Sequence, residues 1–408
     1  MRFLRAAGAA LVGQSGLRRT LAVMAVVIIL LLAGLSLSCG SSSSVSLKGP
    51  DHNAYVTLPK NGSVALLHID GATGVITMGA QTPQVVGTTP TGLALLPSKK
   101  FLYAVNSRSN SISIFNVALD GVLTLSGTPI PVGGSGPDAA VIDPSGSYLL
   151  VTNNFTNDIS VFSIDPGSGA LSPVGSPVPA NSDPSEILFT HSGKFVYVTN
   201  PSIGMVSGFS FCPPQLASEP QCSAANGVLS PVKNSPVSSG AGAFGLAVDG
   251  SDSFLYVANP SASNPPPYAT TVGNISGFNI DPNTGALTTT ILGSPFTAAN
   301  GAGPTAITVD PSGRFVYAVT TGSSFSIWCF AIDPTNGQLV AATNSPFSLA
   351  AGGLFALIDP SGNYFYIGSQ AGNGIVGYTY NASTGLPTAI AGSPFSTGVS
   401  PGKMVLSE

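Results

Sequence analysis

The stretch "DPSGSYLLVTN" at residues 143–153 joins a tight turn to a strand. Asp, Pro and Gly are typical turn residues, and the apolar run that follows them is typical of a buried strand. The same phrase returns as "DPSGRFVYAVT" at 310–320 and "DPSGNYFYIGS" at 359–369, with a looser copy, "HSGKFVYVTN", at 191–200. A phrase repeated this often predicts an architecture built from repeats.

Alignment on this strand gives seven copies of one repeat. Each copy has an apolar strand, a tight turn, the aligned strand, an alternating third strand, a turn such as "DPNTG" and a short outer strand. The equivalent residues are Tyr55, Tyr103, Leu150, Tyr197, Tyr256, Tyr317 and Tyr366, and they lie 47 to 61 residues apart. This spacing predicts an all-β, seven-bladed β-propeller with four antiparallel strands per blade over residues 51–408.

The two ends of the repeat region complement each other. The copy at Tyr55 has no first strand upstream, whereas "SPGKMVLSE" at 400–408 resembles the first strand "TPTGLALLPS" at 89–98. We therefore expect the C-terminal strand to complete the first blade and to close the ring, because closure removes exposed sheet edges.

Acidic residues in the turns have a structural role in this scheme. Asp can accept backbone N–H groups of its own turn, while Pro and Gly provide the turn geometry. Nine of the seventeen acidic residues are explained in this way, namely Asp70, Asp120, Asp143, Asp165, Asp249, Asp281, Asp310, Asp333 and Asp359. Few ionisable residues are then left for chemistry, since only 7% of the chain is charged.

The first 38 residues form a separate segment. Arg2, Arg5, Arg18 and Arg19 precede an apolar run that ends at Cys39, and a serine-rich tether follows over residues 39–50. This order is that of an export signal and resembles a bacterial lipoprotein signal with Cys39 as the acylated residue. An uncleaved membrane anchor and ordinary signal cleavage are the alternatives. All three place the propeller outside the cytoplasm, with the membrane contacted through the N-terminal segment alone.

Charge and cysteine use are consistent with export. Without residues 1–38, nine Lys and Arg face seventeen Asp and Glu, a net charge of −8, which argues against nucleic acid or an anionic membrane surface as a partner. Cys212 and Cys222, in the insertion "CPPQLASEPQC", are expected to form a disulfide in an oxidising compartment. Cys329 lies in an apolar strand and is expected to be a buried thiol.

The tetrad Tyr197-Val198-Thr199-Asn200, within the pattern "P…DPSG…YV.N…IS.F.ID..TGAL", resembles YVTN-type repeats. The whole of residues 50–408 is similar to the bacterial lactonase family of seven-bladed propellers. The resemblance implies hydrolysis of sugar lactones of the 6-phosphogluconolactone type. Members often carry His after the Pro that opens the innermost strand, whereas this chain has Thr91, Asp138, Ser185, Thr305 and Gly402 at those positions.

In a propeller, the starts of the innermost strands surround the mouth of the central channel, where ligands bind. For a lactonase, Glu186 or Asp138 would act as general base on water, and Arg108 or Lys403 would stabilise the oxyanion or hold an anionic substrate. We expect further contacts to a small lactone or sugar acid from Asp183, Asn106, Asn153, Asn200 and Asn259. Glu186 stands out because a carboxylate at the start of an apolar strand destabilises the fold unless it has an ion-pair partner or is hydrated.

Structural roles compete with these assignments. The four Asn residues can be turn formers and caps, and Asp138 and Asp183 can satisfy local backbone groups. No cofactor is expected, and no metal site, because His52 and His191 are predicted in loops and His68 in a strand. The scarcity of ionisable groups keeps a second function open, a non-catalytic module that binds a protein or glycan partner. The insertion at 259–274 would then extend the mouth.

Overall fold

The computed structural model describes residues 51–214, 218–219, 222, 228–260, 273–297, 303–321, 325–349, 352–369 and 372–407. The predicted signal or anchor, the tether and Cys39 lie outside the described residues, as do most of the 259–274 insertion and part of the 212–227 insertion. Within the described part of the chain, no helix has the length and apolar character needed to cross a bilayer.

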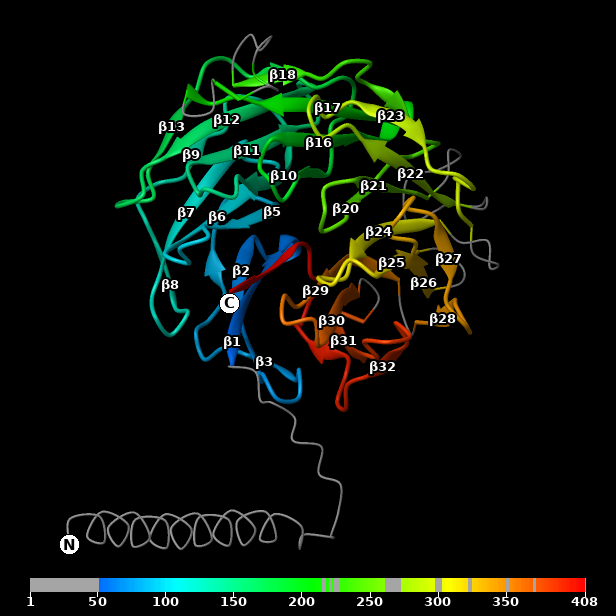
Figure 1. Ribbon diagram of the computed structural model, residues 1–408. Coiled ribbons are helices and arrows are strands. Elements are labelled where there is room, and N and C mark those ends of the chain that lie inside the picture. The colour runs from blue at the N-terminus through cyan, green and yellow to red at the C-terminus, as the bar shows by residue number, and fades with distance from the viewer. Residues whose placement is uncertain are drawn as a thin grey trace, which may run out of the picture. The chain divides into compact units, whose positions relative to one another are not determined.

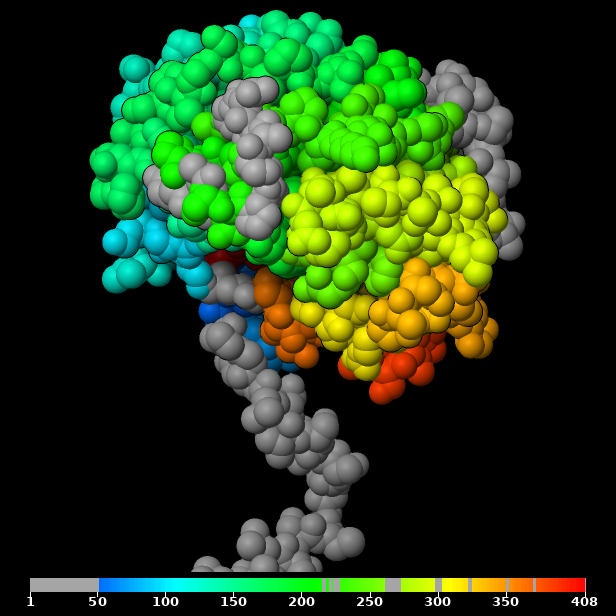
Figure 2. Space-filling view, turned by 45° about the horizontal axis from the view of Figure 1, so that its top comes forward, coloured from blue at the N-terminus to red at the C-terminus, as the bar shows by residue number. Residues whose placement is uncertain are grey.

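Seven antiparallel sheets form the blades of a propeller, arranged in chain order around a central channel (Figure 1). In the space-filling view the neighbouring blades abut, and their colours succeed one another in the same order (Figure 2). The predicted fold class is confirmed. The innermost strands of blades 1 to 7 are β34 (Met404–Ser407), β5 (Pro90–Leu95), β10 (Pro137–Ile142), β15 (Ile187–Phe189), β20 (Gly245–Val248), β24 (Pro304–Val309) and β29 (Gly353–Ile358).

The other strands follow outward in each blade. The second strands are β1 (His52–Leu58), β6 (Phe101–Asn106), β11 (Tyr148–Asn153), β16 (Phe195–Asn200), β21 (Phe254–Asn259), β25 (Phe315–Thr320) and β30 (Tyr364–Ser369). The third strands are β2 (Ser63–Ile69), β7 (Ser111–Val117), β12 (Asp158–Ile164), β17 (Met205–Phe211), β22 (Asn274–Ile280), β26 (Ser326–Ile332) and β31 (Gly374–Tyr380). The outer strands are β3 (Ile76–Met78), β8 (Leu123–Leu125), β13 (Leu171–Pro173), β18 (Leu229–Pro231), β23 (Leu287–Thr290), β27 (Leu339–Ala341) and β32 (Pro387–Ala389).

Blade 1 closes the ring as the sequence predicted. Its sheet has the order β3-β2-β1-β34, so the C-terminal strand lies inside a blade whose other strands come from the N-terminal end of the propeller. Tyr55 on β1 is the register partner of Val405 on β34. The ring therefore has no open edge between its first and last blades.

A short fifth strand is added to most blades, a feature that the prediction of four strands missed. Each is two residues long and pairs with the mouth-side end of the third strand. They are β4 (Gln84–Val85), β9 (Ile130–Pro131), β14 (Val178–Pro179), β19 (Val237–Ser238), β28 (Phe347–Ser348) and β33 (Phe395–Ser396). Blade 5 has a single bridge, Ile275 to Phe296, at the corresponding place.

The turn carboxylates act within their turns as predicted. Asp143 accepts hydrogen bonds from the N–H groups of Ser145, Ser147 and Tyr148 at 2.6–3.1 Å. Asp281, in the turn between the third and outer strands of blade 5, accepts hydrogen bonds from the N–H groups of Asn283 and Thr284, both at 2.9 Å. These carboxylates are structural and are not available as ligand groups.

The repeated tyrosine joins each blade to the next. The Tyr256 hydroxyl, for example, donates to the carbonyl oxygen of Gly337 at 2.8 Å, and this glycine belongs to the "DPTNG" turn of blade 6. Six of the seven aligned residues are fully buried tyrosines that make this bond, with partners Gly121, Gly169, Gly285, Gly337, Gly385 and Gly74. Leu150 of blade 3 is the exception.

Candidate functional site

The central channel encloses a cavity of about 670 Å³. Residues of the innermost strands, or in blade 4 directly before that strand, line it in all seven blades, together with Pro59 and Lys60 of the short helix η1 (Pro59–Asn61) in blade 1. Much of the wall is apolar or small, including Ala139, Ala306 and Phe355. The few charged residues in this wall therefore define the chemistry of the channel.

Glu186 and Lys403 meet across the channel. The Lys403 ammonium donates to Glu186 Oε2 at 2.5 Å, although 217 residues separate the two positions. Blades 1 and 4 face each other across a ring of seven, so this ion pair bridges the channel from wall to wall. The pair explains how a carboxylate is tolerated at an apolar strand start.

Both residues are held in the same way by the second strand of their own blade. The N–H of Glu186 donates to Thr199 Oγ1 at 3.1 Å, and the N–H of Lys403 donates to Thr57 Oγ1 at 2.8 Å. These two threonines are each two residues beyond the aligned tyrosine, so Glu186 and Lys403 occupy equivalent positions in blades 4 and 1.

At the same level, most other blades carry small residues. The register places Gly92, Ala139, Gly245 and Ala306 at the positions equivalent to Glu186. Small residues leave the centre of the channel open, which gives the two long side chains room to meet.

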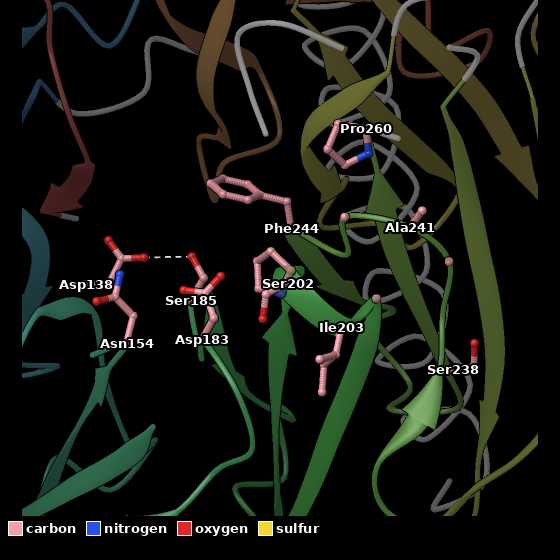
Figure 3. A pocket seen from close by; sticks show the side chains of 14 residues that line it. Asp138, Asn154, Asp183, Ser185, Ser202, Ile203, Ser238, Ala241, Phe244 and Pro260 are labelled. Carbon is pink, nitrogen blue, oxygen red and sulfur yellow. Dashed lines mark hydrogen bonds between the residues drawn. The ribbon is translucent and has the colours of Figure 1, made fainter. Parts of the chain in front are cut away.

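Asp138 lies one residue nearer the mouth than the ion pair. Its Oδ2 accepts a hydrogen bond from Ser185 Oγ at 2.7 Å (Figure 3). Burial raises the pKa of the Asp138 carboxyl, and the neighbouring charge of Glu186 raises it further, while the Ser185 hydrogen bond and Lys403 oppose the shift. Such a carboxyl is better suited to accept a proton near neutral pH than an ordinary Asp.

A second cavity opens beside the channel, among the mouth-side loops of blades 3, 4 and 5, and we call it the side pocket. It encloses about 710 Å³ and shares Asp138, Ser185 and Phe244 with the channel wall. Asp183 also lines it, in the left-handed backbone region at φ 55°. Burial raises the pKa of Asp183 as well, with a contribution from the charge of Asp138.

The other predicted site residues lie away from the two cavities. Arg108 is exposed on the loop after β6 and is not part of either wall. The four asparagines are buried inside the blades, where their amides bond neighbouring groups instead of facing a ligand. The bonds of Asn106, Asn153, Asn200 and Asn259 run to Ser113, Ser160, Ala180 and Ser276, at 2.7–3.0 Å.

Several residues of the site were not predicted. Ser185 holds Asp138, Lys60 reaches the channel from η1, and Ile203 lines the side pocket. Phe155 lines neither cavity but is exposed beside them, on the mouth-side loop of blade 3. The ring of Phe155 is 75% exposed, and Ile203 is 44% exposed. An exposed aromatic residue in a short turn, "NNFT", was the one signal in the sequence that could have indicated a binding surface.

The histidines and cysteines serve the scaffold. His52 is the first residue of β1, contrary to the loop prediction, and its Nε2 lies 2.7 Å from Asp359 Oδ2 of blade 7. Among the described residues, no group of three or more His, Cys, Asp or Glu is arranged to hold a metal ion. Cys212 and Cys222 are joined by a disulfide, and Cys329 is a buried free thiol.

With the fold and the site in view, comparison with known proteins gives a family. The chain matches the family described as "Lactonase, 7-bladed beta-propeller" over residues 48–183 and 271–399. This match spans more than half of the chain. The protein belongs to the lactonase family of seven-bladed β-propellers.

Solved structures with the same fold come from several bacteria. A candidate 6-phosphogluconolactonase from Bacteroides uniformis is 20% identical, with a TM-score of 0.71 over 88% of this chain and 100% of that one. The periplasmic gluconolactonase PpgL of Pseudomonas aeruginosa is 17% identical, with a TM-score of 0.69 over 88% of this chain and 99% of that one. At these identities the likeness establishes the fold. No curated protein sequence matches this chain.

Proposed function

We propose that this protein hydrolyses sugar lactones at the mouth of its channel, outside the cytoplasm. The observation that carries the proposal is the position of Asp138, a carboxyl of raised pKa set above an ion pair that presents an ammonium group to the channel. Membership of the lactonase family supports the reaction class. The disulfide between Cys212 and Cys222 supports an oxidising compartment.

Asp138 is a better general base than Glu186 in this geometry. Glu186 is engaged by Lys403 at 2.5 Å, so its charge is already compensated. Asp138 has the raised pKa and is held by one hydroxyl, that of Ser185. Glu186 then acts as a positioning residue, since it fixes the Lys403 ammonium below the substrate.

The reaction follows from these roles. The Asp138 carboxylate takes a proton from a water molecule while the water oxygen attacks the lactone carbonyl carbon. The Lys403 ammonium stabilises the negative charge that develops on the carbonyl oxygen. The carbon–oxygen bond of the ring then breaks, and protonated Asp138 returns its proton to the leaving ring oxygen. The product is an open-chain sugar acid.

Charge at the mouth favours an unphosphorylated substrate. Asp138, Asp183 and Glu186 line the two cavities, against Lys60 and Lys403. Lys403 is already paired, so a dianionic phosphate would meet an excess of negative charge. A neutral aldonolactone meets no such repulsion.

The test is an assay of acid release by the purified full chain in mild detergent, on glucono-δ-lactone, galactono-γ-lactone and 6-phosphoglucono-δ-lactone. We expect turnover of the neutral lactones and a loss of about 10²–10⁴-fold in kcat for Asp138→Asn. Asp120→Asn, which changes an exposed turn carboxylate, is the matched control. An absence of turnover on every lactone would refute the proposal and would favour a non-catalytic binding module.

A further inference from the structure

The side pocket is too large to be only an entrance to the reacting centre. Its volume is about 710 Å³, beside about 670 Å³ in the channel. Each value by itself lies within the range of about 300–1,000 Å³ that holds a drug-sized ligand. A single lactone ring placed over Lys403 would therefore leave the side pocket empty.

The walls of the side pocket change in character along its length. Asp138, Asn154, Asp183 and Ser185 gather at the end that adjoins the channel, whereas Ile203, Ala241 and Pro260 lie toward the other end, with Phe244 between the two groups (Figure 3). The polar end is therefore the end at which the lactone reacts. The far end offers apolar surface.

Hydroxyl groups and bare backbone accompany this apolar surface. Ser202 and Ser238 line the pocket, as do Gly204, Gly240 and Gly242. A Cβ at Gly204 would come within 2.5 Å of the Gly240 carbonyl oxygen, so the close approach of the two loops that form this wall depends on glycine. A pocket with apolar patches, hydroxyls and backbone groups matches a sugar ring, which has apolar C–H faces and a rim of hydroxyls.

The charges in the side pocket are those of carboxylates. Asp138 and Asp183 line it, and no Lys or Arg among the described residues does. Carboxylates accept hydrogen bonds from sugar hydroxyls and repel anionic groups. The ligand of this pocket is therefore expected to be neutral.

We infer that the side pocket is a subsite for a second, neutral sugar ring, so that the preferred substrates are lactones of disaccharides or longer oligosaccharides. This inference rests on the proposed lactone hydrolysis for its reaction, and on the pocket itself for its binding. The lactone ring lies in the channel over Lys403, and the glycosidically linked ring extends past Ser185 toward Ile203 and Phe244.

The kinetic test compares cellobiono-δ-lactone with glucono-δ-lactone. In the native protein we expect kcat/KM to be at least tenfold higher for the disaccharide lactone. Ala241→Met fills the far end of the side pocket and is expected to lower that ratio at least tenfold, and Ile203→Ala, which removes apolar surface, to lower it by a smaller factor. Ala341→Met, an equal change on the exposed outer strand of blade 6, is the control and keeps the ratio. Equal kcat/KM for both lactones in the native protein would overturn the inference.

A binding test separates the subsite from catalysis. Cellobiitol and lactitol contain a sugar ring but no lactone, so their binding by calorimetry does not depend on hydrolysis. Binding that Ala241→Met weakens at least tenfold supports the subsite, even where no lactone is turned over and the proposed reaction fails. Hydrolysis of glucono-δ-lactone without detectable binding of either alditol, or binding that neither variant changes, overturns the subsite and leaves the reaction standing.

Discussion

Blades 3 and 4 differ from blades 6 and 7 in the way that they are joined. Between blades 6 and 7, the Tyr317 hydroxyl donates to the Gly385 carbonyl oxygen at 2.9 Å. Between blades 3 and 4, Leu150 stands in place of the tyrosine, and the turn between the third and outer strands of blade 4 is lengthened by the insertion that carries Cys212 and Cys222. The hydroxyl donor of the other interfaces is thus missing at the same interface at which the facing turn is enlarged.

The channel strands of the two regions differ as well. Blades 6 and 7 present Thr305, Ala306, Leu354 and Phe355 to the channel, none of which is ionisable. Blades 3 and 4 present Asp138, Ser185 and Glu186. Blades 6 and 7 therefore follow the repeat both in their channel-facing residues and in the contact between them. Blades 3 and 4, which carry the candidate site, depart from the repeat in both features. The following predictions test this contrast.

After Asp138, replacement of Lys403 should have the largest effect. Lys403→Met removes the ammonium that faces the developing oxyanion and leaves Glu186 without its partner. We expect kcat on a neutral lactone to fall by about 10²–10³-fold. Lys100→Met, at an exposed turn of blade 2, should leave kcat unchanged. Equal activity of the two variants would show that the ion pair only fills the channel.

Removal of the disulfide should affect stability but not chemistry. For the double variant Cys212→Ser, Cys222→Ser, we expect the free energy of unfolding to fall by about 2–3 kcal/mol, because the closed loop is short. Urea unfolding of the native protein with reductant should reproduce this loss, and reductant should not change the double variant. A matching loss on addition of reductant to the double variant would show that the effect does not come from this disulfide.

The tyrosine bond can be broken in one region and introduced in the other. Tyr256→Phe leaves the Gly337 carbonyl without its buried donor, and we expect a loss of about 1–2 kcal/mol in the free energy of unfolding. Leu150→Tyr places a larger side chain and a hydroxyl at a fully buried position that leucine fills, and it should destabilise by about 1–3 kcal/mol. Stabilisation by Leu150→Tyr in urea titrations would contradict this prediction and would mean that blade 4 supplies an acceptor for the new hydroxyl.

Much of this contrast was within reach of the sequence. Seven copies of one phrase, and a missing first strand matched by a surplus last strand, were enough to predict the ring and its closure. The two-residue fifth strands escaped prediction because two residues carry no hydrophobic period. Leu150 was visible as the one aligned residue that is not tyrosine. Its meaning required the Tyr–Gly bonds between blades, each of which joins a strand tyrosine to a turn glycine 66 to 292 residues away in the sequence.

The site was predictable only residue by residue. Glu186, Asp138 and Lys403 stood out because ionisable residues are rare at strand starts in this chain. The pairing of Glu186 with Lys403 depends on blades 1 and 4 facing each other across the channel. It also depends on the small residues Gly92, Ala139 and Gly245, and no local sequence pattern encodes either condition. The side pocket is built from loops of three blades, so it had no signal in the sequence at all.

The smallest effect expected is a displacement of the pH profile. The Glu186 charge raises the pKa of Asp138, while Lys403 lowers it. Glu186→Gln removes the negative charge that raises this pKa and leaves the Lys403 ammonium without its carboxylate partner. The pKa of Asp138 should therefore fall, and the acidic limb of kcat/KM against pH, which reports the base of the free enzyme, should move to lower pH.

A matched control exists on the opposite face of blade 4. Glu219 also pairs with a lysine, Lys194, at 3.3 Å, so Glu219→Gln removes a comparable ion pair without approaching the channel. It should leave the acidic limb in place. If Glu186→Gln abolishes turnover at every pH, Glu186 is the base and Asp138 only shapes its surroundings. If turnover is retained and the acidic limb moves, the proton transfer is assigned to Asp138. The channel then contains a base, Asp138, and an ion pair, Glu186 with Lys403, that have separate tasks.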